Sequence, residues 1–461
     1  MKQHQRLAAL GLACALLATA CGGHETVESD TTDAPANTTA TTATDSATTE
    51  PGQFGTMTEA VCGPGDASGA TDQGVTDDSI TVSALADPGN TIIPGLLQEL
   101  HDASKAFVQW CNEAGGINGR KIELVLRDAK LVEGQAAIAS ACAEDFMMVG
   151  GGSGFDAPIA EPRVACGLPQ IPAFLNDPVA QAAGLQIQSI NPFYPDYVDT
   201  APYNLLAKAY PDDITKFAYL IPDIPTSGTP IQDRLLPLLE SDFGYKVLYQ
   251  NTTPAPPATV DNWRPYVEPA KDAGATIYEF RSTAEQTVPL MATMAEVGYT
   301  PKAVILQGNN YDAKLIANNP FLDQTATYIA LAAHPYEDAE NNPPTQQFLD
   351  AMDAVVPGWS AKPAQLGVFS WSSWLLFALA AKECGSELTR DCVLANAKAV
   401  EEFDGGGLHA PTNPDPDAPQ GPTCVVMVRA TSSGFEMAPD VTRPTDGIYN
   451  CDPKNSTKAP R

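Results

Sequence analysis

Apolar and polar residues in the first half of the chain alternate between the period of a strand and that of a helix. Ser79–Leu85 alternates between polar and apolar residues up to Ala84, which is typical of a strand. Apolar residues then recur at helical spacing over Pro94–Ala114, until Gly115 and Gly116 end the predicted helix. The remaining elements predicted in this half are strands over 121–126, 146–149 and 169–174 and a helix over 132–143.

The same pattern resumes after a Pro-containing break at Ile190–Pro195. The elements predicted there are strands over 216–221, 246–250, 276–280 and 303–306 and helices over 231–242 and 283–297. Alternation of strand and helix is typical of a parallel sheet that helices cover on both faces. Two such runs predict an α/β protein with two doubly wound parallel-sheet lobes.

The N-terminus has the pattern of an export signal. Lys2 and Arg6 precede the apolar run Leu7–Leu17, which is too short to span a bilayer. The small residues directly before Cys21 resemble the lipobox of bacterial lipoproteins, in which the signal is removed and the cysteine is lipidated. This resemblance implies a signal peptide over 1–20 and a lipid anchor at the outer face of the cytoplasmic membrane. Ordinary cleavage, which would leave Cys21 as a free thiol, is the alternative.

A polar segment follows the cysteine. Residues 26–58 are mainly Thr, Ala, Ser, Asp and Glu, with almost no large apolar side chains. Such a segment cannot bury enough surface to offset its ordering entropy. We therefore predict a disordered tether over 21–60, with a reach of roughly 30–35 Å.

The net charge of the chain excludes some classes of binding partner. With 56 acidic and 26 basic residues, the 461-residue chain has a formal net charge of −30. This charge would repel a phosphate backbone and disfavours electrostatic docking on anionic lipid, so no nucleic-acid partner is expected. The apolar run Leu375–Ala381 ends at Lys382 and predicts a buried helix, not a membrane span.

The chain has ten cysteines, and their number and spacing predict disulfide bonds. Cys14 leaves with the signal and Cys21 would carry lipid, and the other eight are Cys62, Cys111, Cys142, Cys166, Cys384, Cys392, Cys424 and Cys451. An even number of cysteines outside the cytoplasm predicts disulfides. None forms a Cys-x-x-Cys pair and no histidine lies at zinc-ligand spacing, so four bridges are favoured over a metal site. No metal and no cofactor is expected.

Three motifs point to a family. They are Asn112–Leu124 with Asp128 after it, Gly150–Ser153, and Phe403–Leu408. In this order they resemble the type I periplasmic binding proteins, and more narrowly the branched-chain amino acid and amide binding proteins of ABC importers. The resemblance covers roughly residues 75–440 and implies a multi-strand hinge between two lobes, with the ligand in the cleft. We expect Gly115 and Gly116 to form the turn after the helix and Arg120 to pair locally.

The resemblance also sets the expected domains. They are a first lobe of residues 61–190 plus 338–402, a second lobe of 191–337 plus 403–440, and a tail of 441–461. In a sheet of flavodoxin-like order, the second and third helices share one face, which favours Cys142–Cys166 and leaves Cys111 for Cys62. Cys384–Cys392 would join adjacent helix ends, and Cys424–Cys451 would tie the tail to the last pair of strands. The four expected bridges are Cys62–Cys111, Cys142–Cys166, Cys384–Cys392 and Cys424–Cys451.

Ligands of open parallel sheets bind beyond the carboxyl ends of the strands. The loops that qualify are 87–90, 153–155 and 174–176 in the first lobe and 224–227 and 307–311 in the second. The resemblance implies that Ser153 and Gly154 grip a ligand carboxylate with hydroxyl and backbone N–H groups. The candidate ligand-binding residues are Ser153, Gly154, Phe155, Phe174, Phe193, Tyr194, Thr226, Gln307, Asn309 and Tyr311.

The second-lobe loop is neutral except for one acid. Amino-acid binders of the family place an acid against the ligand ammonium, but this loop offers Gln307 and Asn309, with Asp312 its one carboxylate. Amides cannot repay the desolvation of a buried ammonium. A partly apolar or aromatic solute is therefore favoured over an unmodified amino acid. The alternative for the aromatic candidates is that they pack in the hinge or core, as we expect of Trp371 and Trp374.

Enzyme signatures are missing from the sequence. Gly151–Phe155 lacks the final glycine of a nucleophile elbow, and no Lys-Ser/Thr follows the glycines as in a phosphate loop. We predict no catalytic residue. The predicted function is a monomeric, lipid-anchored binding protein that delivers a small solute to an ABC permease. A ligand sensor of the same fold and a secreted hydrolase are the alternatives.

Overall fold

The computed structural model describes residues 50–190, 197–224, 228–254, 258–418 and 421–458. The predicted signal peptide, Cys21 and most of the predicted tether lie outside these ranges. None of the helices in the described ranges combines the length and hydropathy needed to cross a bilayer.

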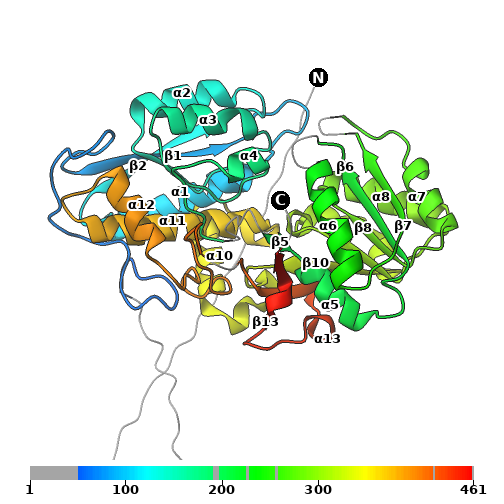
Figure 1. Cartoon of the computed structure of the whole chain (residues 1–461). Helices are drawn as coiled ribbons and strands as arrows, with labels where there is room; N and C mark the ends of the chain where they lie inside the picture. Colours follow the sequence, from blue (N-terminus) through cyan, green and yellow to red (C-terminus); the bar gives the residue numbers. More distant parts are fainter. Residues whose placement is uncertain (1–49, 191–196, 225–227, 255–257, 419–420, 459–461) are drawn as a thin grey trace, which may run out of the picture. The chain divides into compact units, whose positions relative to one another are not determined.

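A four-stranded parallel sheet organises the first lobe (Figure 1). Its strand order is β2-β1-β3-β4, the flavodoxin-like order that the sequence predicts. The strands are β1 (Ser79–Ala86), β2 (Lys121–Asp128), β3 (Met147–Val149) and β4 (Gln170–Ile171). The helices between and after them are α1 (Gln98–Ala114), α2 (Gly134–Glu144), α3 (Ala157–Ala165) and α4 (Pro178–Gln181).

Helices cover both faces of this sheet. On one face, Leu85 and Met148 pack with Ile138 of α2 and Ile159 of α3. On the other face, the sheet packs against α1 and against α11 (Gln365–Cys384). In Figure 1, α2 and α3 accordingly lie on the opposite side of β1 from α1 and α11. The predicted doubly wound arrangement is confirmed.

Helix α11 is buried almost all round, because it fills the interior of the first lobe. Trp371 and Trp374 are completely buried, and Phe107 of α1 stacks on Trp374 with 5.6 Å between ring centroids. The prediction that these tryptophans belong to the core is confirmed. Two further helices, α10 (Pro343–Val355) and α12 (Arg390–Lys398), flank α11 in the chain.

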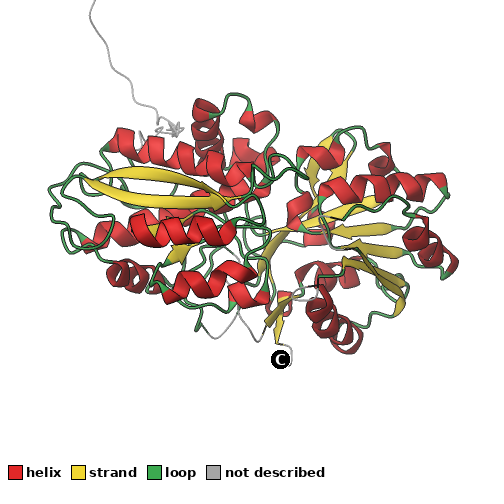
Figure 2. Ribbon diagram, turned by 90° about the horizontal axis from the view of Figure 1, so that it is seen from above, coloured by secondary structure: helices red, strands yellow, loops and turns green. Residues whose placement is uncertain are grey.

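The second lobe is built on a larger sheet of order β12-β11-β10-β9-β8-β6-β7. Strands β6 to β10 are parallel, and β11 pairs antiparallel with both β10 and β12. Figure 2 shows this sheet between layers of helices. The strands are β6 (Phe217–Pro222), β7 (Val247–Thr253), β8 (Ile277–Phe280), β9 (Ala303–Leu306), β10 (Ala326–Leu331), β11 (Cys424–Thr431) and β12 (Gly434–Met437), and β13 (Asn450–Cys451) pairs with β11.

Side chains on the two faces of this sheet enter separate cores. One face packs against α5 (Ala201–Ala209) and α6 (Gly228–Asp242), and the other against α7 (Arg264–Asp272) and α8 (Ala284–Glu296). The shorter elements are α9 (Ala313–Ile316), α13 (Pro439–Thr442), β5 (Tyr197–Asp199) and β14 (Ser456–Lys458), with 3-10 turns η1 (Gly308–Asn310), η2 (Pro320–Asp323), η3 (Tyr336–Asn341), η4 (Trp359–Ala361) and η5 (Pro453–Asn455). Strands β5 and β14 form an antiparallel pair.

Three passages of the chain meet beside the ends of β10 and β11. Ala333 forms an isolated antiparallel bridge with His409, and the Ala410 N–H donates to the Ala332 carbonyl at 3.2 Å. Thr412 Oγ1 donates to the Ser189 carbonyl at 2.6 Å, which brings the third passage to the other two. These contacts form a multi-strand connection of the kind that the family resemblance implies.

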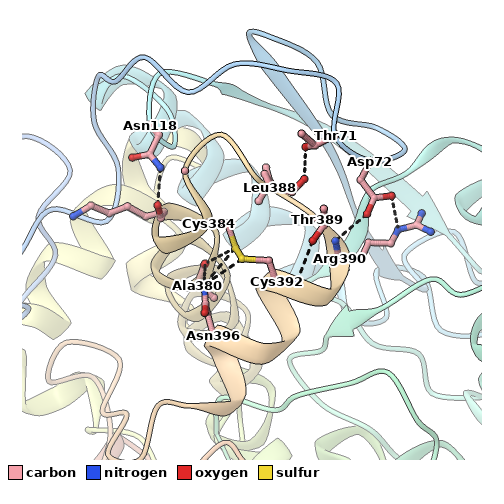
Figure 3. Close-up of a disulfide and its surroundings, with 12 residues drawn as sticks. Thr71, Asp72, Asn118, Ala380, Cys384, Leu388, Thr389, Arg390, Cys392 and Asn396 are labelled. Atoms are coloured by element: carbon pink, nitrogen blue, oxygen red, sulfur yellow. Dashed lines mark hydrogen bonds and ion pairs between the residues drawn. A yellow bond between two sulfur atoms is a disulfide. The ribbon is translucent and has the colours of Figure 1, made fainter.

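All four expected disulfides are confirmed. The pairs are Cys62–Cys111, Cys142–Cys166, Cys384–Cys392 and Cys424–Cys451. Figure 3 shows the third pair between α11 and α12, next to a segment that precedes β1. There Asp72 accepts from the Arg390 N–H at 2.9 Å, and Asn118 donates to the Lys382 carbonyl at 2.7 Å.

Two expectations need correction. The predicted tether ends too late, because Phe54 is completely buried and its ring lies 5.4 Å from that of Trp371. A single aromatic side chain with a core site can order a polar segment by burying its apolar area. Arg120 does not pair only locally, because its guanidinium donates to the carbonyls of Gly69 at 3.0 Å and Gly385 at 2.9 Å. The turn at Gly115 and Gly116 is confirmed, with φ of 127° and 85°.

Candidate functional site

The loops that follow β1, β2 and β3 converge on one buried carboxylate. Asp87, directly after β1, is completely buried. Its oxygens accept from Ser153 Oγ at 3.0 Å, from the Gly154 N–H at 2.8 Å and from the Leu131 N–H at 2.7 Å. The hydroxyl and N–H donors that the family resemblance assigns to a ligand carboxylate therefore bind Asp87.

The outer side of the same edge is apolar. Phe155 is 52% exposed, Val132 77% and Ile92 56%, and these three residues follow β3, β2 and β1 respectively. Apolar side chains exposed one at a time are common on soluble proteins and do not by themselves mark a binding surface. Phe155, a predicted ligand contact, thus lies in an accessible position.

Phe174 belongs to the loop after β4, which is tied to the loop after β3. The Asn176 N–H donates to Asp156 Oδ2 at 2.7 Å, and the Asn176 amide donates to the Gly154 carbonyl at 3.2 Å. Burial raises the pKa of Asp156 to about 6. A Cβ on Gly152 would lie 2.4 Å from the Phe174 ring, so only glycine fits at position 152. The position of Phe174 is therefore fixed by the Ser153 loop.

In the second lobe, Gln307 meets a buried polar cluster. Its amide oxygen, in the orientation that satisfies both groups, accepts from Arg281 Nη2 at 2.6 Å. Arg281 also donates to Tyr203 Oη at 2.9 Å and forms an ion pair with Glu279 at 3.2 Å. Burial disfavours both charges, and the pKa of Glu279 is raised above its ordinary value. Tyr219 Oη and Glu279 Oε2 are buried without a hydrogen-bond partner among the described residues.

Tyr311 lies in the core, not on an open surface. It is 3% exposed, stacks on Tyr336 with 5.4 Å between centroids, and packs edge-on against Phe435 at 4.6 Å. Its hydroxyl donates to Glu337 and accepts from the Tyr336 N–H at 2.8 Å. Of the interpretations left open for the aromatic candidates, packing in the core describes Tyr311. Asn309, two residues earlier, is exposed.

On this side of the molecule the two lobes touch. Asp312, which follows η1, forms a backbone bridge with Ala364, which precedes α11. Burial at the start of α1 raises the pKa of Glu99 to about 7, and nearby Asp312 adds to this shift while Lys314 opposes it. A carboxylate of each lobe thus lies close to the other at this contact.

A cavity of ≈ 340 Å³ lies between residues of both lobes. Its size suits a small organic molecule. The apolar lining includes Phe174, Leu175 and Ile190 from the first lobe's sequence, Phe369 of α11, and Val425 of β11. The polar lining consists of Gln181, Gln188, Tyr197, Asp199, Thr423 and Ser456.

Asp199, at the end of β5, is the one charged side chain among the described residues that line this cavity. It is open to solvent on the cavity side, and the Ala201 N–H donates to its Oδ1 at 3.0 Å. The protein around its other sides raises its pKa, and nearby Arg281 opposes this shift.

The cavity only partly matches the predicted site. Phe174 lines it, whereas the predicted contacts in the loops after β3 and β9 do not. Phe193, Tyr194 and Thr226 lie outside the described residues. The sequence analysis missed Asp199 and the other polar lining residues, because it considered only loops at the carboxyl ends of the long strands. The sequence signal that could have pointed to Asp199 is its position shortly after the Pro-containing break at Ile190–Pro195.

Two α/β lobes with a multi-strand connection and a cavity between them define a two-lobed binding protein. A model of the periplasmic binding protein family matches residues 96–434. The chain therefore belongs to this family, whose members are solute-binding proteins of ABC transporters. No curated protein matches the chain.

Solved structures resemble the chain in fold. A fatty acid ABC transporter substrate-binding protein from Thermomonospora curvata has a TM-score of 0.67 at 14% identity, over 86% of this chain and 97% of its own. The branched-chain amino acid binding protein LivJ from Streptococcus pneumoniae, in complex with isoleucine, has a TM-score of 0.61 at 15% identity, over 78% and 98%. A solute-binding protein from Rhodopseudomonas palustris, in complex with 3,4-dihydroxybenzoic acid, has a TM-score of 0.58 at 15% identity, over 77% and 93%.

Proposed function

We propose that the chain is a lipid-anchored binding protein of an ABC importer, which carries a small, partly apolar solute in the cavity around Phe174 and Asp199. The cavity carries this proposal, because a solute there would contact both lobes at once. Contacts to both lobes exist only when the lobes are together, so a bound solute stabilises that arrangement. The relatives crystallised with isoleucine and with 3,4-dihydroxybenzoic acid support solutes of this size.

The domains follow from the same proposal. The first lobe comprises 50–190 plus 338–402, since Phe54 packs into its core. The second comprises 197–337 plus 403–440, and residues 441–458 form a tail that Cys424–Cys451 ties to β11. The protein acts as a monomer without catalytic activity, and the loaded form docks on the permease.

Thermal unfolding in a library of organic solutes tests the binding function. A solute that binds only the folded protein at 100 times its Kd adds about 2.7 kcal/mol to stability and raises the Tm. A Phe174→Ala variant should lose most of this shift, while Phe155→Ala, which changes an exposed ring outside the cavity, should keep it. If no solute raises the Tm of the wild-type protein, the binding proposal is wrong.

Mass spectrometry of the protein purified from the bacterial membrane tests the anchor. The expected mature N-terminus is Cys21 carrying acyl groups. An unmodified Cys21 in the exported protein would contradict the anchor without touching the solute-binding proposal.

A further inference from the structure

The described residues that line the cavity include one negative charge and no positive charge. Asp199 is the one charged residue among the described lining residues. The other polar lining side chains, such as Gln188 and Thr423, are neutral. A ligand carboxylate placed here would meet a carboxylate with no lining cation to offset it.

The nearest guanidinium does not change this balance. Arg281 influences the pKa of Asp199, but its charge is already matched by Glu279, and its N–H groups donate to Tyr203 and Gln307. Two carboxylates, Asp199 and Glu279, thus interact electrostatically with one guanidinium. Arg281 therefore supplies no unmatched positive charge to a ligand in the cavity.

The loop of Ser153 and Gly154 in the first lobe, where a ligand carboxylate is expected, has no free donors for an anion either. Asp87 occupies the donors of Ser153, Gly154 and Leu131 and is completely buried. A second carboxylate at these donors would have to displace Asp87 or lie beside it in a region of low dielectric.

We propose that the solute carries no carboxylate, and that it presents an amine or another hydrogen-bond-donating group to Asp199 while its apolar body packs against Phe174 and Phe369. This inference rests on the proposed solute-binding function and names the chemical class of the ligand. It separates this chain from relatives crystallised with isoleucine or 3,4-dihydroxybenzoic acid, which both carry a carboxylate.

Calorimetry with two matched probe sets at pH 7 tests the inference. The sets are benzoate, benzamide and benzylamine, and hexanoate, hexanamide and hexylamine. Within each set the apolar body is constant and only the head group changes. We expect the amine to bind at least tenfold more tightly than the acid, with the amide between them.

Two variants test whether Asp199 causes the preference for an amine. Asp199→Asn should bring the affinities for amine and amide within about twofold of each other, because it keeps the shape of the side chain and removes its charge. Asp261→Asn, a change at an exposed residue of the second lobe outside the cavity lining, should keep the wild-type preference. Both variants are first shown to unfold at the wild-type Tm.

The opposing outcomes are distinct. An acid that binds as tightly as its amine, or an amine preference that survives Asp199→Asn, overturns the inference. If none of the six probes binds but a carboxylate from the solute library does, the ligand class is wrong and the solute-binding proposal stands. If nothing in the library binds, both are wrong.

Discussion

Replacing Asp87 by alanine should destabilise the first lobe strongly. The carboxylate, which follows β1, accepts three hydrogen bonds from the loops that follow β2 and β3, at 2.7–3.0 Å. Charge-assisted bonds contribute about 1.5–3 kcal/mol each, and removing the acceptor leaves buried donors unpaired. Allowing for the relief of burying a carboxylate, we expect the free energy of unfolding to fall by about 3–5 kcal/mol.

Urea unfolding followed by tryptophan fluorescence measures this loss, since Trp371 and Trp374 lie in the core of the same lobe. Asp66→Ala is the matched control, because Asp66 is exposed and its change should stay within about 0.5 kcal/mol. A loss below about 1 kcal/mol for Asp87→Ala would refute the role assigned to this carboxylate.

Three further predictions concern stability. Phe54→Ala should lower the free energy of unfolding by about 3–5 kcal/mol, because it leaves a cavity in the core beside Trp371. An unchanged urea midpoint would show that residues 50–60 belong to the tether. Burial raises the pKa of Glu99 from 4.5 to about 7, so the free energy of unfolding falls progressively as pH rises from 4.5 to 7, and the full loss applies above pH 7. Glu99→Gln should therefore raise the free energy of unfolding by about 2–3 kcal/mol at pH 8 and by little at pH 4, and equal effects at both pH values would contradict this. Tyr311→Ala should lower it by about 3–5 kcal/mol in the absence of solute, and full stability with weakened solute binding would instead make Tyr311 a ligand contact.

Much of the fold could be predicted from the sequence, because strands such as β1 and β9 are almost wholly buried and helices such as α1 and α11 end at glycines. Strand β1 ends one residue beyond its predicted bound, and α1 ends before Gly115, as predicted. Strand β10 was missed, since Thr327 and Tyr328 interrupt its apolar residues. Phe54 was missed because one aromatic residue in a polar segment has no periodicity.

The candidate site was harder to predict because its contacts join distant parts of the chain. Asp87 lies 44 residues from Leu131 and 66 from Ser153, and no local pattern shows that their loops share one carboxylate. Asp199 pairs across two short strands with Ser456, near the other end of the chain. Sequence reasoning identified the loops at the strand ends, but which donors remain free depends on tertiary contacts.

A crystal structure of the protein soaked with benzylamine tests the central claim most directly. We expect density for the probe in the cavity, with its nitrogen within hydrogen-bond distance of Asp199 and its ring against Phe174. A cavity without probe density, or density in which the nitrogen points away from Asp199, would contradict the account.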